Sequence, residues 1–319
     1  MLAVFSLIFA VVPMVFYLWM VWLMDRYDRE PIGLLMLHFL WGALGAVFFG
    51  IIGSIILSAL VGTNEFGDAI FVAPVVEEIT KGILLFATVR MRRFDNITDG
   101  IVYGMAIGLG FGMTENFLYF LSAQTVGDWV FLVIVRTLFS AVMHAMATGI
   151  FGAFVGATKF SGFFKRVVFR LLGLFIAMLM HFTWNYSVSI NDPAAQGLGL
   201  VFILISVVII FVILQIALAY ESKLIRRELG EEVKLGIIPA EHLSYLPYSS
   251  KRRLQGWMPV ADKKKEYIRL ATELAFRRYQ LVRCKENERQ SYENDIERIR
   301  REIKLIFGVD ETATPQTLF

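Results

Sequence analysis

The chain alternates between long apolar stretches and short polar segments over its first 220 residues, and then changes character. A helix needs about 20 consecutive apolar residues to cross a bilayer. Seven stretches meet this length and are predicted to span the membrane: residues 2–24, 32–60, 69–89, 101–122, 129–158, 167–190 and 197–219. Between residues 261 and 307, apolar positions recur instead every three or four residues, as in amphipathic helices. We therefore expect an all-α polytopic membrane bundle of about seven spans with a helical C-terminal region outside the membrane.

Charge follows the same division. Residues 1–220 carry 23 charged side chains, whereas residues 221–319 carry 36 in less than half the length. The sequence predicts a membrane domain over 1–220, a linker over 221–260 and a helical cytosolic tail over 261–319. The net charge of +3 is too small to favour a nucleic-acid partner, so the lipid bilayer is the expected surrounding of the first domain.

Basic residues in the connecting segments predict the orientation, because cytosolic loops of membrane proteins are enriched in Lys and Arg. The segments before the second, fourth and sixth spans contain Lys or Arg, and the loops before the third, fifth and seventh contain none. This alternation places the N-terminus outside and the C-terminus in the cytosol. The single cysteine, Cys284, lies in the polar tail, which fits a reducing compartment.

Two adjacent carboxylates, Glu77 and Glu78, lie in the middle of the third predicted span. An ionised group at the bilayer centre costs at least ~2.5–3.5 kcal/mol, so intramembrane carboxylates usually mark functional sites. Lys81 follows Glu77 by four residues, and residues at this spacing share a helix face. We therefore expect Lys81 to neutralise or orient Glu77.

Three further spans carry polar residues at comparable depth. A rise of ~1.5 Å per residue places Glu115, His181 and Asn185 in the outer half of the membrane, near Glu77. His144 lies deeper on the fifth span if that helix is straight. These residues are the ones predicted to form a common site.

Glycines at positions 100, 104, 108 and 112 repeat every four residues along the fourth span. Rows of small residues let membrane helices approach closely. We expect this row to bring Glu115 towards Glu77.

Several functions use buried carboxylates and histidines, and the residues alone leave them open. The chain contains no His-Glu-x-x-His zinc signature and no phosphate-binding loop. An intramembrane endopeptidase needs its groups in one pocket, whereas a proton-coupled transporter or channel needs them strung across the bilayer. A separation of more than ~10 Å between Glu77 and His181 would favour such a relay. A catalytically inactive membrane receptor is the third alternative.

The polar elements resemble the PrsW family of intramembrane proteases and, more distantly, the CAAX-processing endopeptidases. The resemblance covers roughly residues 1–220. It rests on these elements, in order: Glu77-Glu78-Ile79-Thr80-Lys81, Gly110-Phe111-Gly112-Met113-Thr114-Glu115-Asn116, His144, and His181-Phe182-Thr183-Trp184-Asn185. The CAAX-processing enzymes place the basic residue one position later than Lys81, so residue roles transfer less directly from them.

The resemblance implies hydrolysis of a peptide bond in a membrane-associated protein, such as a single-span anti-sigma factor, in a bacterial cytoplasmic membrane. We expect Glu77 to activate the attacking water, with Glu78, His181 and Asn185 as the other catalytic residues. Glu115, His144 and His181 could alternatively supply three ligands to a zinc ion, a common number at catalytic zinc sites. Both mechanisms remain open from the sequence.

Overall fold

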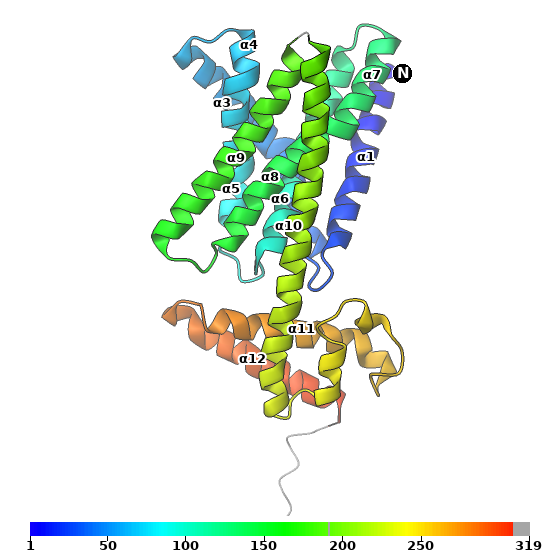
Figure 1. The fold of residues 1–319 in the computed structure, drawn as a ribbon, viewed down its shortest axis with the longest axis vertical. Helices are drawn as coiled ribbons and strands as arrows, with labels where there is room; N and C mark the ends of the chain where they lie inside the picture. Colours follow the sequence, from blue (N-terminus) through cyan, green and yellow to red (C-terminus); the bar gives the residue numbers. More distant parts are fainter. Residues whose placement is uncertain (191, 309–319) are drawn as a thin grey trace, which may run out of the picture. The chain divides into compact units, whose positions relative to one another are not determined.

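A computed structural model describes residues 1–190 and 192–308 of the chain (Figure 1). These residues are mostly helical and include no β-strand, which confirms the predicted all-α class. The chain forms two compact units. The membrane unit comprises residues 1–25 and 29–215, and the tail unit comprises residues 26–28 and the chain from residue 216 onward.

Six helical stretches in the described part of the chain are long and apolar enough to cross a membrane. They are Leu2–Met24, Ile32–Val61, Ile97–Ser122, Val126–Ala157, Phe163–Ser189 and Pro193–Lys234, and they correspond to six of the seven predicted spans. The remaining predicted span, 69–89, is also helical: the π-helical turn Asp68–Val72 runs directly into a 16-residue α-helix. It is set apart from the other six by charge rather than by length, because Glu77, Glu78 and Lys81 all lie in this α-helix.

The helices of the membrane unit follow each other with few connecting residues. In chain order they are α1 (Leu2–Met24), α2 (Ile32–Leu40), η1 (Trp41–Ala46), α3 (Val47–Val61), α4 (Glu65–Gly67), η2 (Asp68–Val72), α5 (Ala73–Thr88), α6 (Ile97–Ser122), α7 (Val126–Val135), η3 (Arg136–Ser140), α8 (Ala141–Ala157), α9 (Phe163–Ser189) and α10 (Pro193–Lys234). Helix α10 begins in this unit and its residues from Ile216 onward belong to the tail unit.

Helix α6 forms the core of the membrane unit, since nearly all of its first 16 residues are buried. Its glycine row packs against α8: a Cβ added to Gly104 or Gly108 would overlap the carbonyl group of Thr148 or His144. The predicted close approach is confirmed, and the helix that the row meets is α8. Glu115 bonds His144 on α8, and it also lines the same cavity as Glu77.

Three π-helical turns interrupt the membrane helices. The turns η1, η2 and η3 directly precede α3, α5 and α8. A π turn holds an extra residue and rotates the helix that follows, and such turns recur at functional sites. Of the side chains described below, Glu77, Glu78, Lys81 and His144 project from helices that follow such turns, whereas Glu115, His181 and Asn185 lie on α6 and α9, which do not.

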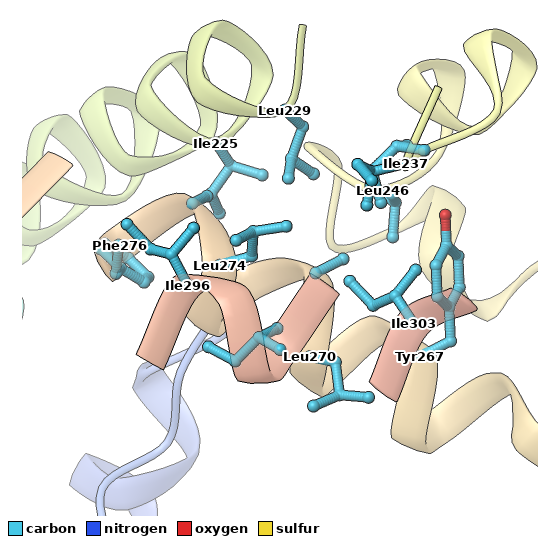
Figure 2. Close-up of a cluster of buried hydrophobic side chains, with 14 of the residues drawn as sticks. Ile225, Leu229, Ile237, Leu246, Tyr267, Leu270, Leu274, Phe276, Ile296 and Ile303 are labelled. Carbon is cyan, nitrogen blue, oxygen red and sulfur yellow. The ribbon is translucent and has the colours of Figure 1, made fainter. Parts of the chain in front are cut away.

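The tail unit is built around the C-terminal part of α10 and two further helices, α11 (Lys264–Leu281) and α12 (Glu286–Ile306). Short 3₁₀ turns, η4 (Ala240–Ser244), η5 (Lys251–Arg253) and η6 (Ala261–Lys263), connect them. Figure 2 shows apolar side chains from all three helices meeting in one core, including Ile225, Leu274 and Ile303. The predicted 221–260 linker stays a prediction, but its residues 221–234 continue α10.

Candidate active site

The predicted site residues lie on four helices of the membrane unit. Helix α5 carries Glu77, Glu78 and Lys81, α6 carries Glu115, α8 carries His144, and α9 carries His181 and Asn185. All but Asn185 join one continuous network of polar contacts. Their side chains differ in exposure, and this difference separates enclosed groups from groups that line a cavity.

Glu78 is the structural centre of the network. Its side chain is completely buried, and its Oε1 accepts from Lys81 Nζ at 2.7 Å and from His181 Nδ1 at 3.0 Å. Its Oε2 accepts from the Thr148 hydroxyl at 3.3 Å. Each carboxylate oxygen therefore has a donor, as a buried charge requires.

Lys81 bonds to Glu78 rather than to Glu77, the partner that its spacing in the sequence predicts. Its Nζ lies 3.8 Å from Glu77 Oε2, which is too long for a hydrogen bond, while it bonds directly to Glu78. It is completely buried and sits 3.9 Å above the centre of the Phe111 ring. Lys81 thus neutralises Glu78 first, because the i,i+3 spacing brings their end groups closer than the i,i+4 spacing brings Glu77.

The contacts of His144 define its tautomer. Lys81 Nζ lies 3.0 Å from His144 Nδ1, and an ammonium group can only donate. In the neutral ring, His144 Nε2 then carries the proton and donates to Glu115 Oε2 at 2.6 Å. His144 had been expected to lie deepest in the membrane, and the structure brings it into the same network.

His181 is bound to its carboxylate partner through Nδ1, whereas His144 uses Nε2. Its Nδ1 donates to the acceptor-only carboxylate of Glu78, so in the neutral ring its Nε2 is an acceptor. That Nε2 lies 3.8 Å from Glu77 Oε2. Two acceptors therefore face each other, and Glu77 Oε2 has no hydrogen-bond partner among the described residues. Such a pair calls for a proton donor or a cation between them.

Glu115 is held by two partners at once. Arg136, at the start of η3, reaches its Oε2 at 3.0 Å, and His144 reaches the same oxygen. The guanidinium group also lies 3.6 Å from the centre of the Tyr119 ring and donates to Asn116 Oδ1. Glu115 is thereby a charged anchor for His144.

Three donors lie within metal-binding reach of one another. Atoms of Glu77, His144 and His181 are all within 4.8 Å of one another. This set replaces Glu115 of the predicted set with Glu77, because Glu115 points at Arg136. Two imidazoles and a carboxylate are a ligand set typical of catalytic zinc. The carboxylates of Glu78 and Glu115 accept from the other ring nitrogens, as partners of metal-bound histidines commonly do.

Asn185 lies outside the network. Its Nδ2 donates to the carbonyl oxygen of Ala69 in η2 at 2.8 Å. The preceding residue, Trp184, donates to Ser140 Oγ. Asn185 thus fixes the segment that leads into α5, and its role as an oxyanion donor stays a prediction.

An open cavity of about 370 Å³ adjoins the network. Its walls come from α3, from the η2–α5 segment and from α6, and Glu77 and Glu115 are the two network members that line it. Their side chains are 17% and 24% exposed, whereas those of Glu78 and Lys81 are fully buried. The cavity therefore gives water and substrate access to Glu77 and Glu115 only.

Sequence reasoning did not identify Gly50 and Phe111 as site residues, although both line the cavity. Gly50 lies in an apolar run whose polar residue at helical spacing is Ser54, and a glycine four residues before a serine does not by itself indicate a site. The π-helical turns before α3, α5 and α8 were also missed, because they depend on tertiary packing rather than on a residue pattern.

Comparison with known proteins agrees with this geometry. Residues 30–214 match the family described as PrsW family intramembrane metalloprotease. The chain is 30% identical to Protease PrsW of Bacillus subtilis (strain 168) over 52% of this chain and 74% of that protein. It is 28% identical to Protease PrsW of Geobacillus kaustophilus, over 61% of this chain and 85% of the relative.

A third relative, Protease PrsW of Clostridioides difficile, is 29% identical over 61% of this chain and 84% of its own length. No solved structure gives a significant match. Glu77 and His181 lie 3.8 Å apart, well below the separation that a transmembrane relay would require. The site is clustered, the family match covers more than half of the chain, and the chain therefore belongs to the PrsW family of intramembrane proteases.

Proposed function

We propose that Glu77 is the general base of this protease. The observation that carries the proposal is the state of its Oε2, which is buried 3.8 Å from His181 Nε2 and has no hydrogen-bond partner among the described residues, on a side chain that lines the cavity. A carboxylate whose oxygen lacks a donor is free to accept a proton from a water molecule. Glu78 and Glu115, by contrast, already accept from several donors.

The proposed reaction uses this oxygen first as a base and then as an acid. Water attacks the scissile carbonyl carbon, and its proton passes to Glu77. The same proton then moves to the amide nitrogen as the C–N bond breaks, which releases a carboxylic acid and an amine. Glu78 holds His181 in place beside Glu77, and the Lys81 ammonium supplies positive charge 3.8 Å from Glu77 Oε2.

A metal-dependent variant is the second candidate, favoured by the grouping of Glu77, His144 and His181. These residues would hold the ion, and their donor set suits Zn²⁺. A bound zinc ion would supply Lewis acidity and lower the pKa of a coordinated water. In this variant Glu78 and Glu115 would orient the two imidazoles by accepting from His181 Nδ1 and His144 Nε2, which leaves His181 Nε2 and His144 Nδ1 as the ligand atoms. Because His144 Nδ1 lies 3.0 Å from Lys81 Nζ, metal binding would require the Lys81 ammonium to move away from this nitrogen.

One experiment separates the two candidates. Purified wild-type protein and Glu77→Gln are reconstituted with a library of single-span membrane proteins, with and without a chelator, and bound metal is measured on the same samples. Full wild-type cleavage in metal-free protein, lost in Glu77→Gln, supports the general-base mechanism. Cleavage that requires stoichiometric zinc supports the metal variant. Wild-type cleavage by Glu77→Gln rejects both roles for Glu77.

The proposed substrate is a regulatory single-span protein of the bacterial cytoplasmic membrane, such as an anti-sigma factor. This rests on the family and on the intramembrane position of the site. The proposed orientation has the N-terminus outside and the C-terminus in the cytosol, as the distribution of basic loops indicates. Reporter fusions after residues 64, 126 and 193 should report the outer side, and fusions after residues 95, 163 and 240 the cytosol. The reverse pattern would reject the orientation.

A further inference from the structure

The cavity beside Glu77 is asymmetric in its chemistry. The η2–α5 segment and α6 carry the carboxylates Asp68, Glu77 and Glu115, and the α3 wall is apolar apart from Ser54. At about 370 Å³ the cavity lies near the lower end of ligand pockets, which hold ~300–1,000 Å³. It is large enough for one or two side chains of a polypeptide but too small for a whole helix.

Gly50 lies at the point where the apolar wall meets the catalytic carboxylate. It is the only buried residue of α3. A Cβ added there would lie 3.7 Å from Glu77 Cγ and 3.8 Å from the Phe111 ring, which is ordinary van der Waals contact. Most other glycines of the membrane bundle lie against neighbouring backbone or side chains with no such room, as at Gly53, where a Cβ would lie 2.6 Å from Val76 Cγ1.

Helix α3 is also the most lightly packed wall of the cavity. It packs chiefly against α5, and the residues of α3 outside Gly50 are partly or fully exposed. In a membrane these apolar side chains face lipid. The cavity between α3 and α6 is therefore accessible to another membrane-embedded chain without passage through the tightly packed α6–α8 pair.

We infer that this cavity is the subsite for an apolar substrate side chain next to the scissile bond, and that Gly50 sets the size of the side chain accepted. The inference rests on the proposed role of Glu77. The occupant is an unwound segment of a membrane-spanning substrate. Its apolar side chain packs between Phe111 and the α3 wall, and its carbonyl carbon comes within reach of water activated by Glu77. The polar groups of Ser54 and Asp68 line the same cavity and can pair with the freed backbone of that segment.

The first test measures side-chain selectivity in the full-length protein. A single-span substrate carries Ala, Leu or Phe at each position flanking the cleaved bond, and kcat/KM is measured for wild type, Gly50→Ala and Gly50→Leu. We expect the enlarging substitutions to lower cleavage of Leu and Phe substrates about tenfold or more relative to the Ala substrate, because they fill the pocket. Gly50→Ala should change this selectivity less than Gly50→Leu does, and it keeps the test decisive if Gly50→Leu fails to fold.

The matched control is Ile56→Ala, on the same helix but outside the cavity lining, with 55% exposure. It should leave the Leu-to-Ala selectivity ratio unchanged. A uniform loss of cleavage of all three substrates by both Gly50 variants, or no change in the ratio, would overturn the subsite assignment.

A second measurement does not depend on turnover. Gly50→Cys is combined with Glu77→Gln and Cys284→Ser and oxidised with substrates that carry one cysteine at successive positions. Disulfide formation should peak at the residue flanking the scissile bond and be weak for Ile56→Cys in the same background. A flat profile rejects the subsite. If cross-linking peaks as expected but Glu77→Gln alone still cleaves, the subsite stands and the assigned base is wrong.

Discussion

Both units of the protein bury a carboxylate among basic groups, and the two clusters differ in what they leave unsatisfied. In the tail unit Glu232 is completely buried and accepts from Arg278 and Arg300 at 2.6 to 2.9 Å. In the membrane unit Glu78 is satisfied in the same way, yet its neighbour Glu77 lines an open cavity and retains a buried oxygen without a donor among the described residues. Burial of charge is thus common to both clusters, and an acceptor without a donor, on a side chain that lines a cavity, distinguishes the cluster that we propose to be catalytic.

The largest expected effect comes from the same substitution made in both clusters. Glu77→Gln should lower the cleavage rate ~10²–10⁴-fold, the usual contribution of a general base. Thermal stability should change little, because Glu77 Oε2 accepts no hydrogen bond that the substitution would break. Glu232→Gln should leave cleavage chemistry intact and destabilise the tail unit, since two arginines lose their buried partner. Cleavage assays and hydrogen exchange in α11 and α12 measure the two outcomes. If both variants behave alike, the distinction between the clusters fails.

Lys81→Met tests whether the buried ion pair between Lys81 and Glu78 stabilises the membrane unit. It leaves the buried Glu78 charge without its closest cation, and breaking a buried ion pair costs ~3–5 kcal/mol. We expect a clear drop in thermal stability in detergent together with loss of cleavage. The double variant Glu78→Gln/Lys81→Met removes both charges and should recover stability without activity. A stable Lys81→Met single variant would contradict the assigned ion pair.

Asn185→Ala should have a smaller effect. It removes one hydrogen bond to the Ala69 carbonyl, worth about 1 kcal/mol, at the segment that leads into α5. We expect kcat to fall tenfold or less. A loss as large as that of Glu77→Gln would instead restore Asn185 to a direct catalytic role.

The smallest expected effect is a pH dependence of the stability of the tail unit. Burial lowers the pKa of His242 below its ordinary value of 6.5, although nearby Glu241 opposes this. The unfolded chain therefore takes up a proton in a pH range where the folded unit does not. The free energy of unfolding should be greatest above pH 6.5 and decline as the pH falls below it.

The matched variant for this pH effect is His242→Phe, which removes the titrating ring from its contact with the Tyr267 hydroxyl. The pH dependence of the free energy of unfolding is measured by denaturant unfolding at pH 5 and pH 8, with hydrogen exchange in α11 as the readout. An equal decline in wild type and His242→Phe would assign the pH effect to another group.

Much of the architecture follows from local pattern. The length of the apolar stretches predicted seven spans, and six of them match helices long and apolar enough to cross a membrane, because a bilayer imposes one minimum length on every helix that crosses it. The same reasoning identified Glu77, Glu78, Glu115, His144 and His181, since an ionisable group in an apolar run is conspicuous without any tertiary information. The family resemblance rested on these residues and is confirmed.

The partners within the site were decided by packing. Sequence spacing paired Lys81 with Glu77 and placed Glu115 in the candidate metal set, whereas the structure pairs Lys81 with Glu78 and groups Glu77 with the two histidines. Helical periodicity gives the face of each residue but not the rotation of one helix against another. That rotation depends on the glycine contacts between α6 and α8 and on the π turns before α5 and α8.

Gly50 illustrates the limit most clearly. Apolar residues surround it in the chain, and its importance arises entirely from the space left between Glu77 and Phe111 on two other helices. The sequence alone specified which groups enter the membrane, because transfer of apolar and charged side chains into lipid is a property of each residue. Which of those groups meet, and which oxygen remains unpaired, depends on distances between helices, and these exist only once the bundle has packed.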